Sequence, residues 1–414
     1  MVMRVLMLSN RYPPNVSGGA EIAAGDMAVA LRRRGHDVRV LTARDPVNGY
    51  EDEPWVARRL RKVIDPARGP HGETRSALTR TLAFYRQTHS HRSSRTVSRE
   101  AARLRPDVLY LWDVSGIGLV SVLRALHSLT LPIVFQLGSY WWQYINAPQT
   151  PFSTVRAAWL KKLIIGPVPA LRFTSLIATS DTVKRAYVRA GCPPERIEVI
   201  DNAVDAGFLR APGEAPGRHA RPVLMYAGRL CAEKGVTVAL HSVDQLVHRH
   251  GIDVEMRIFG AGDPRYEQRL RELVASRSLE RHVVFCGLVP RERLIAAYDE
   301  ADVVLVPSLW QEPFGLVVLE AMARGAAVVA SDAGALAAVV RDGENGRVVP
   351  AGDADAMAIA VRELLRDDRE RGRLGAAGRR AVEERYTLDV CVSRVERHLE
   401  RARALDLQES RWTA

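Results

Sequence analysis

The feature that most constrains the fold is an alternation of short apolar runs with helical segments. An apolar run at 2–8 leads through a loop rich in Pro and Gly to a helical segment at 22–34, and a second run follows at 38–42. Such alternation predicts parallel strands whose crossover helices cover both faces of a sheet. We therefore predict an α/β fold. The first loop lacks G-x-G-x-x-G and the second run ends at Thr42 instead of an acid, which argues against a dinucleotide-binding dehydrogenase.

The chain has 414 residues, more than one hydrophobic core usually serves. Residues 206–220 are rich in Pro and Gly and lack periodicity, so they are the predicted linker. We expect a first domain at 1–205, a second domain at 221–387, and a final helix with its tail at 388–414. The sequence at 44–75 is loop-like, with many Pro, Gly and Arg.

The segment at 307–325, PSLWQEPFGLVVLEAMARG, predicts a turn followed by a buried helix. Pro313 and Gly315 mark the turn, and the residues after them leave the helix no polar face. Glu320 lies inside this helix and Glu312 just before the turn. A buried carboxylate needs a partner, and the amides at a helix start suit a phosphate. The segment therefore predicts an anion site between two acids. The alternative is a structural unit in which a neighbouring Arg pairs with Glu320.

Glu312 and Glu320 are separated by seven residues, and their surroundings resemble the E-x7-E signature of the retaining glycosyltransferases of family 4. The resemblance implies the GT-B fold, in which two Rossmann-like domains face each other across a cleft and a C-terminal helix crosses back to the first domain. It also implies transfer of a sugar from a nucleoside-diphosphate sugar, with UDP and GDP both open. Glu312 would hold hydroxyls of the transferred sugar, and Glu320 would hold those of the ribose.

Two cations follow the apolar run at 223–227, in the sequence GRLCAEKG. The planar guanidinium of Arg229 and the movable ammonium of Lys234 suit a diphosphate, although two exposed basic residues are the alternative. In the family the matching residues hold the donor diphosphate. With Glu312 they are the predicted catalytic residues, and with these cations present we expect no metal and no cofactor.

The resemblance implies further donor contacts. The amides at the start of the helix would bind the diphosphate, the loop after the strand at 283–286 would meet the nucleobase, and a Gly-rich loop of the first domain would face the phosphates. The positions concerned are Gly18, Gly19, Val289, Phe314, Gly315 and Leu316.

Aromatic residues follow the strand predicted at 133–137, in GSYWWQY. Ends of such strands point into the ligand crevice, and aromatic faces suit sugars, so an acceptor platform and simple core packing are equal alternatives. Many relatives have a pattern similar to L-H-D-Y-W here, and this chain has Gly138 where the His would be. The expected acceptor contacts are Asp113, Gly138, Ser139, Tyr140, Trp141 and Trp142. The acceptor is a small metabolite, a lipid or a glycan.

The net charge of +11 permits contact with nucleic acid, an anionic membrane or an anionic substrate, but scattered Arg residues explain it better. We expect no nucleic-acid partner. A basic amphipathic stretch at 151–173 leaves peripheral contact with the inner face of a membrane open beside a domain-surface helix. The first apolar run is too short for a signal peptide, and the four Cys show no C-x-x-C pair, so we expect a cytoplasmic protein.

Three alternatives to a transferase remain at this stage. A GT-B relative with other chemistry would be a sugar-nucleotide epimerase or a phosphorylase. A protein that binds nucleotide sugars without catalysis is the third.

The D-x-D sequence at 353–355 resembles a metal-binding pattern, but it precedes a helical segment, so helix capping explains it better.

Overall fold

In a computed structural model the chain divides into two compact units. The first comprises residues 1–200 and the chain from Val392 onward, and the second comprises Asp201–Cys391. The residues that the structure describes are 2–16, 18–44, 53–61, 89–114, 117–127, 129, 131–140, 175–209 and 221–405.

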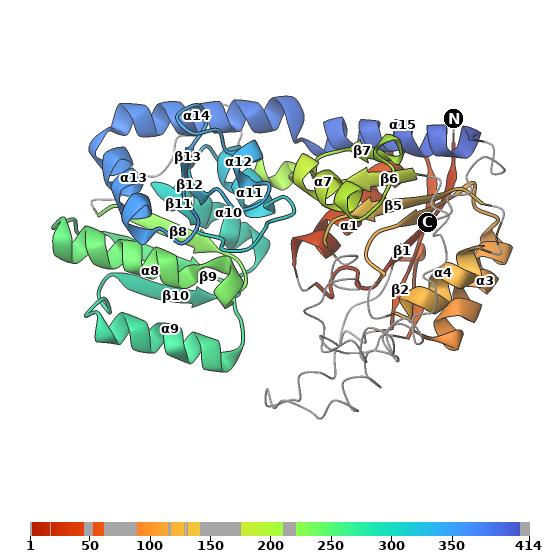
Figure 1. Cartoon of the computed structure of the whole chain (residues 1–414), viewed down its shortest axis with the longest axis horizontal. Coiled ribbons are helices and arrows are strands. Elements are labelled where there is room, and N and C mark those ends of the chain that lie inside the picture. Colours follow the sequence, from red (N-terminus) through yellow and green to blue (C-terminus); the bar gives the residue numbers. More distant parts are fainter. Residues whose placement is uncertain are drawn as a thin grey trace. The chain divides into compact units, whose positions relative to one another are not determined.

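The described part of the first unit contains a seven-stranded parallel sheet in the order β3-β2-β1-β4-β5-β6-β7 (Figure 1). The strands are β1 (Arg4–Ser9), β2 (Asp37–Ala43), β3 (Val56–Leu60), β4 (Val108–Leu111), β5 (Ile133–Leu137), β6 (Ser175–Ala178) and β7 (Ile197–Val199). The helices are α1 (Gly19–Arg33), α3 (His91–Leu104), α4 (Leu119–His127), α7 (Asp181–Arg189) and α15 (Leu388–Ala404). Strands β4, β5 and β6 are buried along their whole length, as the largely apolar strands of a covered parallel sheet should be.

Strand β3 was not predicted, because its residues lie in the stretch interpreted as loop. It pairs with β2 at the edge of the sheet, with Val40 opposite Val56. An edge strand needs partners on one side only, so it tolerates polar residues that a central strand would not. Arg58 illustrates this, because its Nη1 donates to the carbonyl of Tyr12 at 3.2 Å.

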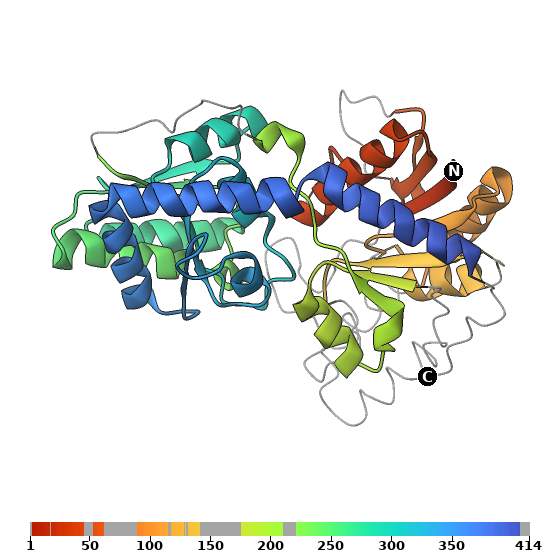
Figure 2. The same ribbon diagram turned by 90° about the horizontal axis from the view of Figure 1, so that it is seen from above.

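From Val392 on, helix α15 belongs to the first unit and runs along it (Figure 2). Buried histidines take part in its packing. His398 Nε2 lies 2.8 Å from Ser175 Oγ on β6, and its Nδ1 lies 2.6 Å from Glu198 Oε2 on β7. Burial lowers the pKa of His398, although the carboxylate of Glu198 opposes this. His36 Nε2 makes a similar contact of 2.9 Å with Glu396 of the helix.

The described part of the second unit contains a six-stranded parallel sheet in the order β10-β9-β8-β11-β12-β13. Helices lie on both of its faces (Figure 1), and each face has its own apolar core. The strands are β8 (Val223–Ala227), β9 (Glu255–Phe259), β10 (Val283–Gly287), β11 (Val303–Val306), β12 (Ala327–Ser331) and β13 (Arg347–Val349). The α-helices are α8 (Val236–Asp244), α9 (Pro264–Ser276), α10 (Arg291–Glu300), α11 (Leu316–Ala323), α12 (Leu336–Val339), α13 (Ala354–Arg366) and α14 (Asp368–Arg385).

The boundary between the units falls before the predicted one, because residues 201–209 pack into the second unit. Arg385 Nε donates to Asp201 Oδ2 at 2.9 Å, and the amide of Val204 donates to the carbonyl of Tyr386. Phe208 is buried against the ring of Tyr298, with centroids 6.0 Å apart. These contacts were not visible in the local composition, which is that of a linker. The rest of the predicted linker, 210–220, lies outside the described residues.

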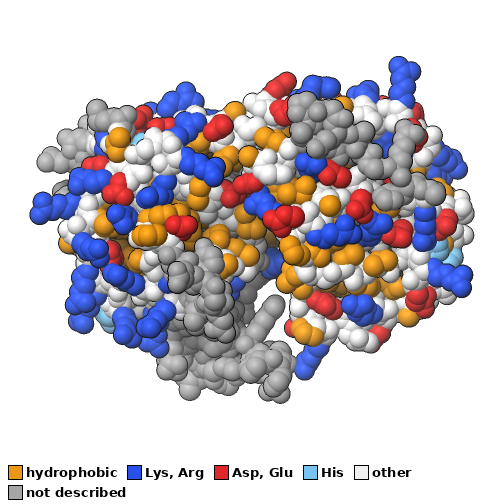
Figure 3. Space-filling view, turned by 180° about the vertical axis from the view of Figure 1, so that it is seen from behind, with side chains coloured by type: hydrophobic (Ala, Val, Ile, Leu, Met, Phe, Trp, Pro, Cys, Tyr) orange, Lys and Arg blue, Asp and Glu red, His pale blue; other side chains and the backbone are white. Residues whose placement is uncertain are grey.

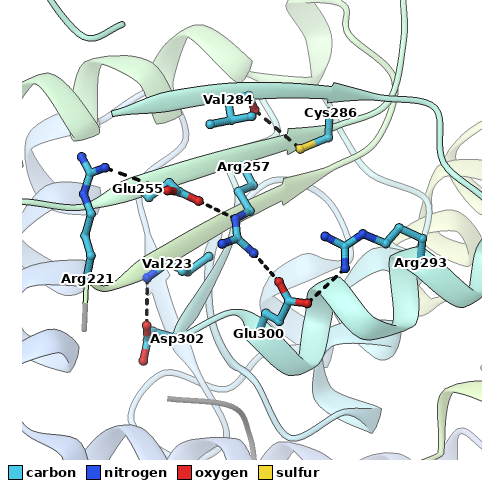
Figure 4. A network of polar contacts seen from close by, with 9 residues as sticks. All are labelled: Arg221, Val223, Glu255, Arg257, Val284, Cys286, Arg293, Glu300 and Asp302. Atoms are coloured by element: carbon cyan, nitrogen blue, oxygen red, sulfur yellow. Dashed lines mark hydrogen bonds and ion pairs between the residues drawn. The ribbon is translucent and has the colours of Figure 1, made fainter. Parts of the chain in front are cut away.

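Ion pairs join β9 to α10 in the second unit (Figure 4). Arg257 Nε donates to Glu255 Oε1 at 2.6 Å, and its Nη1 pairs with Glu300. Glu300 also accepts from Arg293 Nη1 at 3.1 Å. Burial alone would raise the pKa of Glu300, but the hydrogen bonds from the two arginines lower it overall. We interpret this network as structural, because its charges already have partners.

Candidate active site

Lys234 and Glu312 come together at the carboxyl end of the second sheet, as a pair 78 residues apart in sequence. Lys234 follows β8 in a short 3-10 turn, and Glu312 lies in the loop between β11 and α11. Lys234 Nζ donates to Glu312 Oε1 at 2.5 Å, and Ser308 Oγ donates to the same oxygen. Glu312 is only 4% exposed, so its carboxylate is stabilised by these partners and not by water. The Lys234 side chain remains 24% exposed and can still reach a ligand.

Arg229 is the second predicted cation, and it is exposed. No ion pair engages its side chain within the described residues, while its carbonyl accepts a 2.9 Å hydrogen bond from the buried Tyr226 hydroxyl. The loop is therefore anchored through its backbone, and the guanidinium remains available to bind an anion.

The start of helix α11 has the features of an anion site. Gly315 precedes the helix with φ +99°, and no side chain caps the helix. This left-handed φ strains any other residue, and a Cβ on Gly315 would also crowd Leu336 Cδ2 at 2.5 Å, so the position favours glycine. No hydrogen bond within the described residues uses the amides of Phe314, Gly315 or Leu316. The Phe314 ring is buried edge-on against Tyr386, which holds the turn in place.

Glu320 has a partner different from that of Glu312. The hydroxyl of Tyr298, on α10, donates to Glu320 Oε2 at 2.8 Å. Tyr298 is almost fully buried, and burial followed by the charge of Glu320 raises its pKa far above the usual tyrosine range. The phenol therefore stays protonated and orients the carboxylate. Glu320 itself is only partly buried, so the predicted helix is less enclosed than its apolar sequence indicated.

Glycines bring the loops of this site together backbone to backbone. A Cβ on Gly235 would lie 1.8 Å from the carbonyl oxygen of Pro307, and one on Gly260 would lie 1.9 Å from that of Gly228. The amide of Gly228 also donates to Phe259 at 3.0 Å. The loops after β8, β9 and β11 are thus in direct contact, and no side chain fits between them. Near them, Val289 follows β10 and packs partly buried against the core.

The predicted residues of the first unit lie after neighbouring strands. Gly18 precedes α1, and Gly19 is its first residue. Asp113 follows β4, and its carbonyl accepts from the amide of Asn10, which follows β1. Since β1, β4 and β5 are neighbours in a parallel sheet, the residues that follow them share one edge.

The stretch after β5 is only partly described. Among the described residues, a Cβ at Gly138 would meet nothing within 4 Å. The carbonyl of Ser139 accepts from the Tyr187 hydroxyl at 2.9 Å. Tyr140 is buried, which favours core packing over an exposed platform at this position. Trp141 and Trp142 lie outside the described residues.

Comparisons with known proteins give the same assignment in both halves. Residues 17–208 match the family model described as Glycosyltransferase Family 4, and 213–381 match Glycosyl transferases group 1. A phosphatidyl-myo-inositol mannosyltransferase of Mycobacterium leprae (strain TN) is 32% identical over 397 residues, which cover 95% of this chain and 96% of the relative. The chain belongs to glycosyltransferase family 4.

Other family 4 relatives and solved structures extend the comparison. The Mycolicibacterium smegmatis phosphatidyl-myo-inositol mannosyltransferase is 33% identical, with 87% of this chain and 84% of the relative covered. Sucrose-phosphate synthase from Thermosynechococcus elongatus superposes with a TM-score of 0.72 at 20% identity, covering 97% of this chain and 99% of that one. Anabaena Alr3699/HepE in complex with UDP gives 0.70, also at 20% identity, with 96% and 100% covered. The fold is GT-B, as the resemblance implied, and this family 4 protein is a glycosyltransferase.

Several residues of this candidate site were not found from the sequence. Trp310 lies in the loop before Glu312, and Lys234 Nζ is 5.6 Å from the centroid of its ring. Ser308 binds Glu312, and Ser331 Oγ in turn donates to the Ser308 carbonyl at 2.7 Å. A signal existed for Trp310, since an aromatic residue two positions before the acid can reach the cation. None existed for Ser331, which looks like the end of an ordinary buried strand.

Two further expectations concern metals and membranes. The D-x-D sequence caps a helix as predicted, because the Asp353 side chain accepts from the amide of Ala356 at the start of α13. No group of three or more His, Cys, Asp or Glu side chains in the described ranges is placed to bind a metal ion. In the same ranges no helix combines the length and apolarity needed to cross a bilayer.

Proposed function

We propose that this glycosyltransferase moves a sugar from a nucleoside-diphosphate sugar to its acceptor with retention of configuration, and that the second unit holds the donor. The observation that carries the proposal is the Lys234–Glu312 pair, 2.5 Å apart, beside an uncapped helix start. A cation and a row of amides suit the diphosphate, and the buried acid beside them suits sugar hydroxyls.

In this proposal the diphosphate is the leaving group. Arg229, Lys234 and the first amides of α11 stabilise the charge that develops on it as the glycosidic bond breaks. One donor of this kind contributes roughly 3 kcal/mol to the transition state. With two cations and a helix start available, we propose that the reaction needs no divalent metal.

The two acids serve different sugars. Glu312 holds hydroxyls of the transferred sugar, where Lys234 and Ser308 fix its orientation. Glu320, oriented by Tyr298, holds the ribose hydroxyls. A retaining glycosidase instead places two carboxylates about 5 Å apart on either side of one bond. Separate partners for the two acids favour a front-face reaction, in which the leaving phosphate takes the proton of the acceptor hydroxyl.

The names of the relatives guide the choice of substrates. Mannosyltransferases among them make a mannosyl donor the first to test, and the HepE complexes with UDP and UDP-glucose keep UDP donors in the screen. Phosphatidyl-myo-inositol in two of the names makes a lipid the first acceptor class, ahead of a small metabolite or a glycan. A lipid acceptor would bring the protein to the inner face of a membrane as a peripheral protein.

The test compares Glu312→Gln with Glu233→Gln. Glu233 is exposed in the loop that carries Lys234, so the control makes the same chemical change outside the proposed contacts. We expect turnover of the best donor to fall roughly 100-fold or more for Glu312→Gln and to stay near wild type for the control. NMR of the product should show the anomeric configuration of the donor. Near-normal turnover of Glu312→Gln, or an inverted product, would refute the proposal.

A further inference from the structure

A hollow in the first unit is lined by arginines that the proposed reaction does not use. Its volume is about 1,230 Å³, and it lies beside the carboxyl ends of β2 and β3 and along α3. Lys and Arg side chains gather at the lower left of Figure 3, on this unit. The lining residues include five exposed arginines, Arg44, Arg61, Arg92, Arg95 and Arg99.

Among the described residues, the five side chains have no counter-charge. Two other arginines at the hollow are engaged, since Arg58 binds the carbonyl of Tyr12 and Arg59 pairs with Glu100. Glu100 is the sole acid among the described lining residues, and it already faces two guanidinium groups, those of Arg59 and Arg103. Within the described ranges, no hydrogen bond or ion pair engages the five remaining guanidinium groups.

The backbone brings these charges together. Residues 92, 95 and 99 are three and four positions apart, which places their side chains on one face of α3. The first turn of that helix contains no acid, so its positive end adds to the charge. Arg44 and Arg61 each follow one of two paired strands, and the amide of Arg44 donates to Leu60 at 2.8 Å. Like charges three and four residues apart on a helix repel, and a bound anion would offset the repulsion.

We propose that this hollow is a binding site for a ligand with two or more phosphate groups. Guanidinium forks match phosphate oxygens in pairs, and several forks around one concave surface suit more than one phosphate. Among the described lining residues His91 supplies the single ring, and Phe, Tyr and Trp are absent, so this part of the hollow offers phosphate partners far more than a base-stacking platform. Phosphorylated lipid headgroups and soluble polyphosphates share the required chemistry.

Binding to the full chain tests the proposal with two probes. Inorganic triphosphate is titrated by calorimetry, and sedimentation is measured with phosphatidylcholine vesicles that contain or lack cardiolipin, a lipid with two phosphates. The variant Arg92→Gln/Arg95→Gln/Arg99→Gln removes three charges from the hollow. The control Arg366→Gln/Arg369→Gln/Arg380→Gln removes three exposed charges from the second unit. Since triphosphate can also enter the proposed donor site, the difference between the two variants is the quantity that counts.

We expect the hollow variant to weaken binding of at least one probe by roughly tenfold, and the control variant to bind like wild type. Loss for triphosphate alone assigns a soluble ligand, and loss for the anionic vesicles assigns a lipid headgroup. Equal binding by both variants would overturn the proposal, as would tighter binding of a single-stranded oligonucleotide through the same arginines. If the triple variant melts early, Arg44→Gln/Arg61→Gln is the substitute. Because binding is measured, failure here leaves the proposed transferase activity untouched.

Discussion

A methyl group at Gly334 should disturb Glu312 without touching its side chain. Gly334 follows β12 with φ +69°, and the next residue, Ala335, donates from its amide to the Glu312 carbonyl at 2.8 Å. A Cβ at Gly334 would lie 2.2 Å from the Glu312 nitrogen and 2.4 Å from its carbonyl oxygen. Since ordinary contacts begin at 3.4 Å, Gly334→Ala must move one of the two backbones by about 1 Å.

The size of the effect follows from two costs. A left-handed conformation costs an alanine about 1–2 kcal/mol, and overpacking adds about 1–3 kcal/mol. We therefore expect Gly334→Ala to lower the free energy of unfolding by about 2–5 kcal/mol. A displacement of about 1 Å at a positioned acid can cost roughly 100-fold in rate, so kcat should fall by that order.

Gly343→Ala is the matched control. Gly343 has φ +70°, almost the same backbone conformation, but a Cβ there would meet no atom of the described residues within 4 Å. Gly343→Ala should lower the free energy of unfolding by only the conformational cost of about 1–2 kcal/mol, and its kcat should stay near wild type. Urea unfolding followed by circular dichroism gives the stabilities, and steady-state kinetics with the best donor gives kcat. If the two variants unfold at the same midpoint and turn over equally fast, the steric reasoning is wrong.

Three further predictions follow from single contacts. Tyr298→Phe removes the hydroxyl that orients Glu320. The Kd of UDP, measured by calorimetry, should therefore rise by roughly tenfold, with little change in the melting temperature. An unchanged Kd would contradict the proposed role of Glu320 in binding the ribose. Trp310→Ala should raise the donor KM by about threefold, because Lys234 loses its contact with the ring. Trp310→Phe keeps a ring and should return the KM to the wild-type value. Equal KM values for both variants would count against the contact. Burial lowers the pKa of His398 below the ordinary 6.5, so the unfolded chain takes up the proton first and stability is lost as pH falls below 6.5. His398→Gln should therefore lose less of its urea midpoint between about pH 7.5 and 5.5 than wild type, and equal losses would exclude this histidine as the cause.

The central strands of both sheets could be predicted from the sequence. Strands β5 and β8 have the predicted bounds, because each is a short apolar run between turn residues. Strand β3 was missed since an edge strand with two arginines lacks that pattern. Helix α3 is largely polar and buries few side chains, so its sequence has the pattern of a solvated helix end.

The sequence predicted which residues form the candidate site better than it predicted the contacts between them. The motif located Lys234 and Glu312 separately, but their 2.5 Å contact depends on β8 and β11 lying side by side. Tyr298 gave no signal, because a tyrosine on an amphipathic helix has the pattern of an ordinary core residue. Partners that come from distant strands and helices are set by the topology, which local sequence patterns do not encode.

The contacts of Gly235 and Gly260 bear on how this family could change its substrates. Close main-chain contacts fix how these loops approach one another, so an exposed side chain that faces a ligand can be replaced without altering these approaches. Nucleotide preference could then drift during evolution, or be redesigned, one exposed residue at a time without rebuilding the loops. The glycines themselves are the positions at which a single mutation would end that freedom.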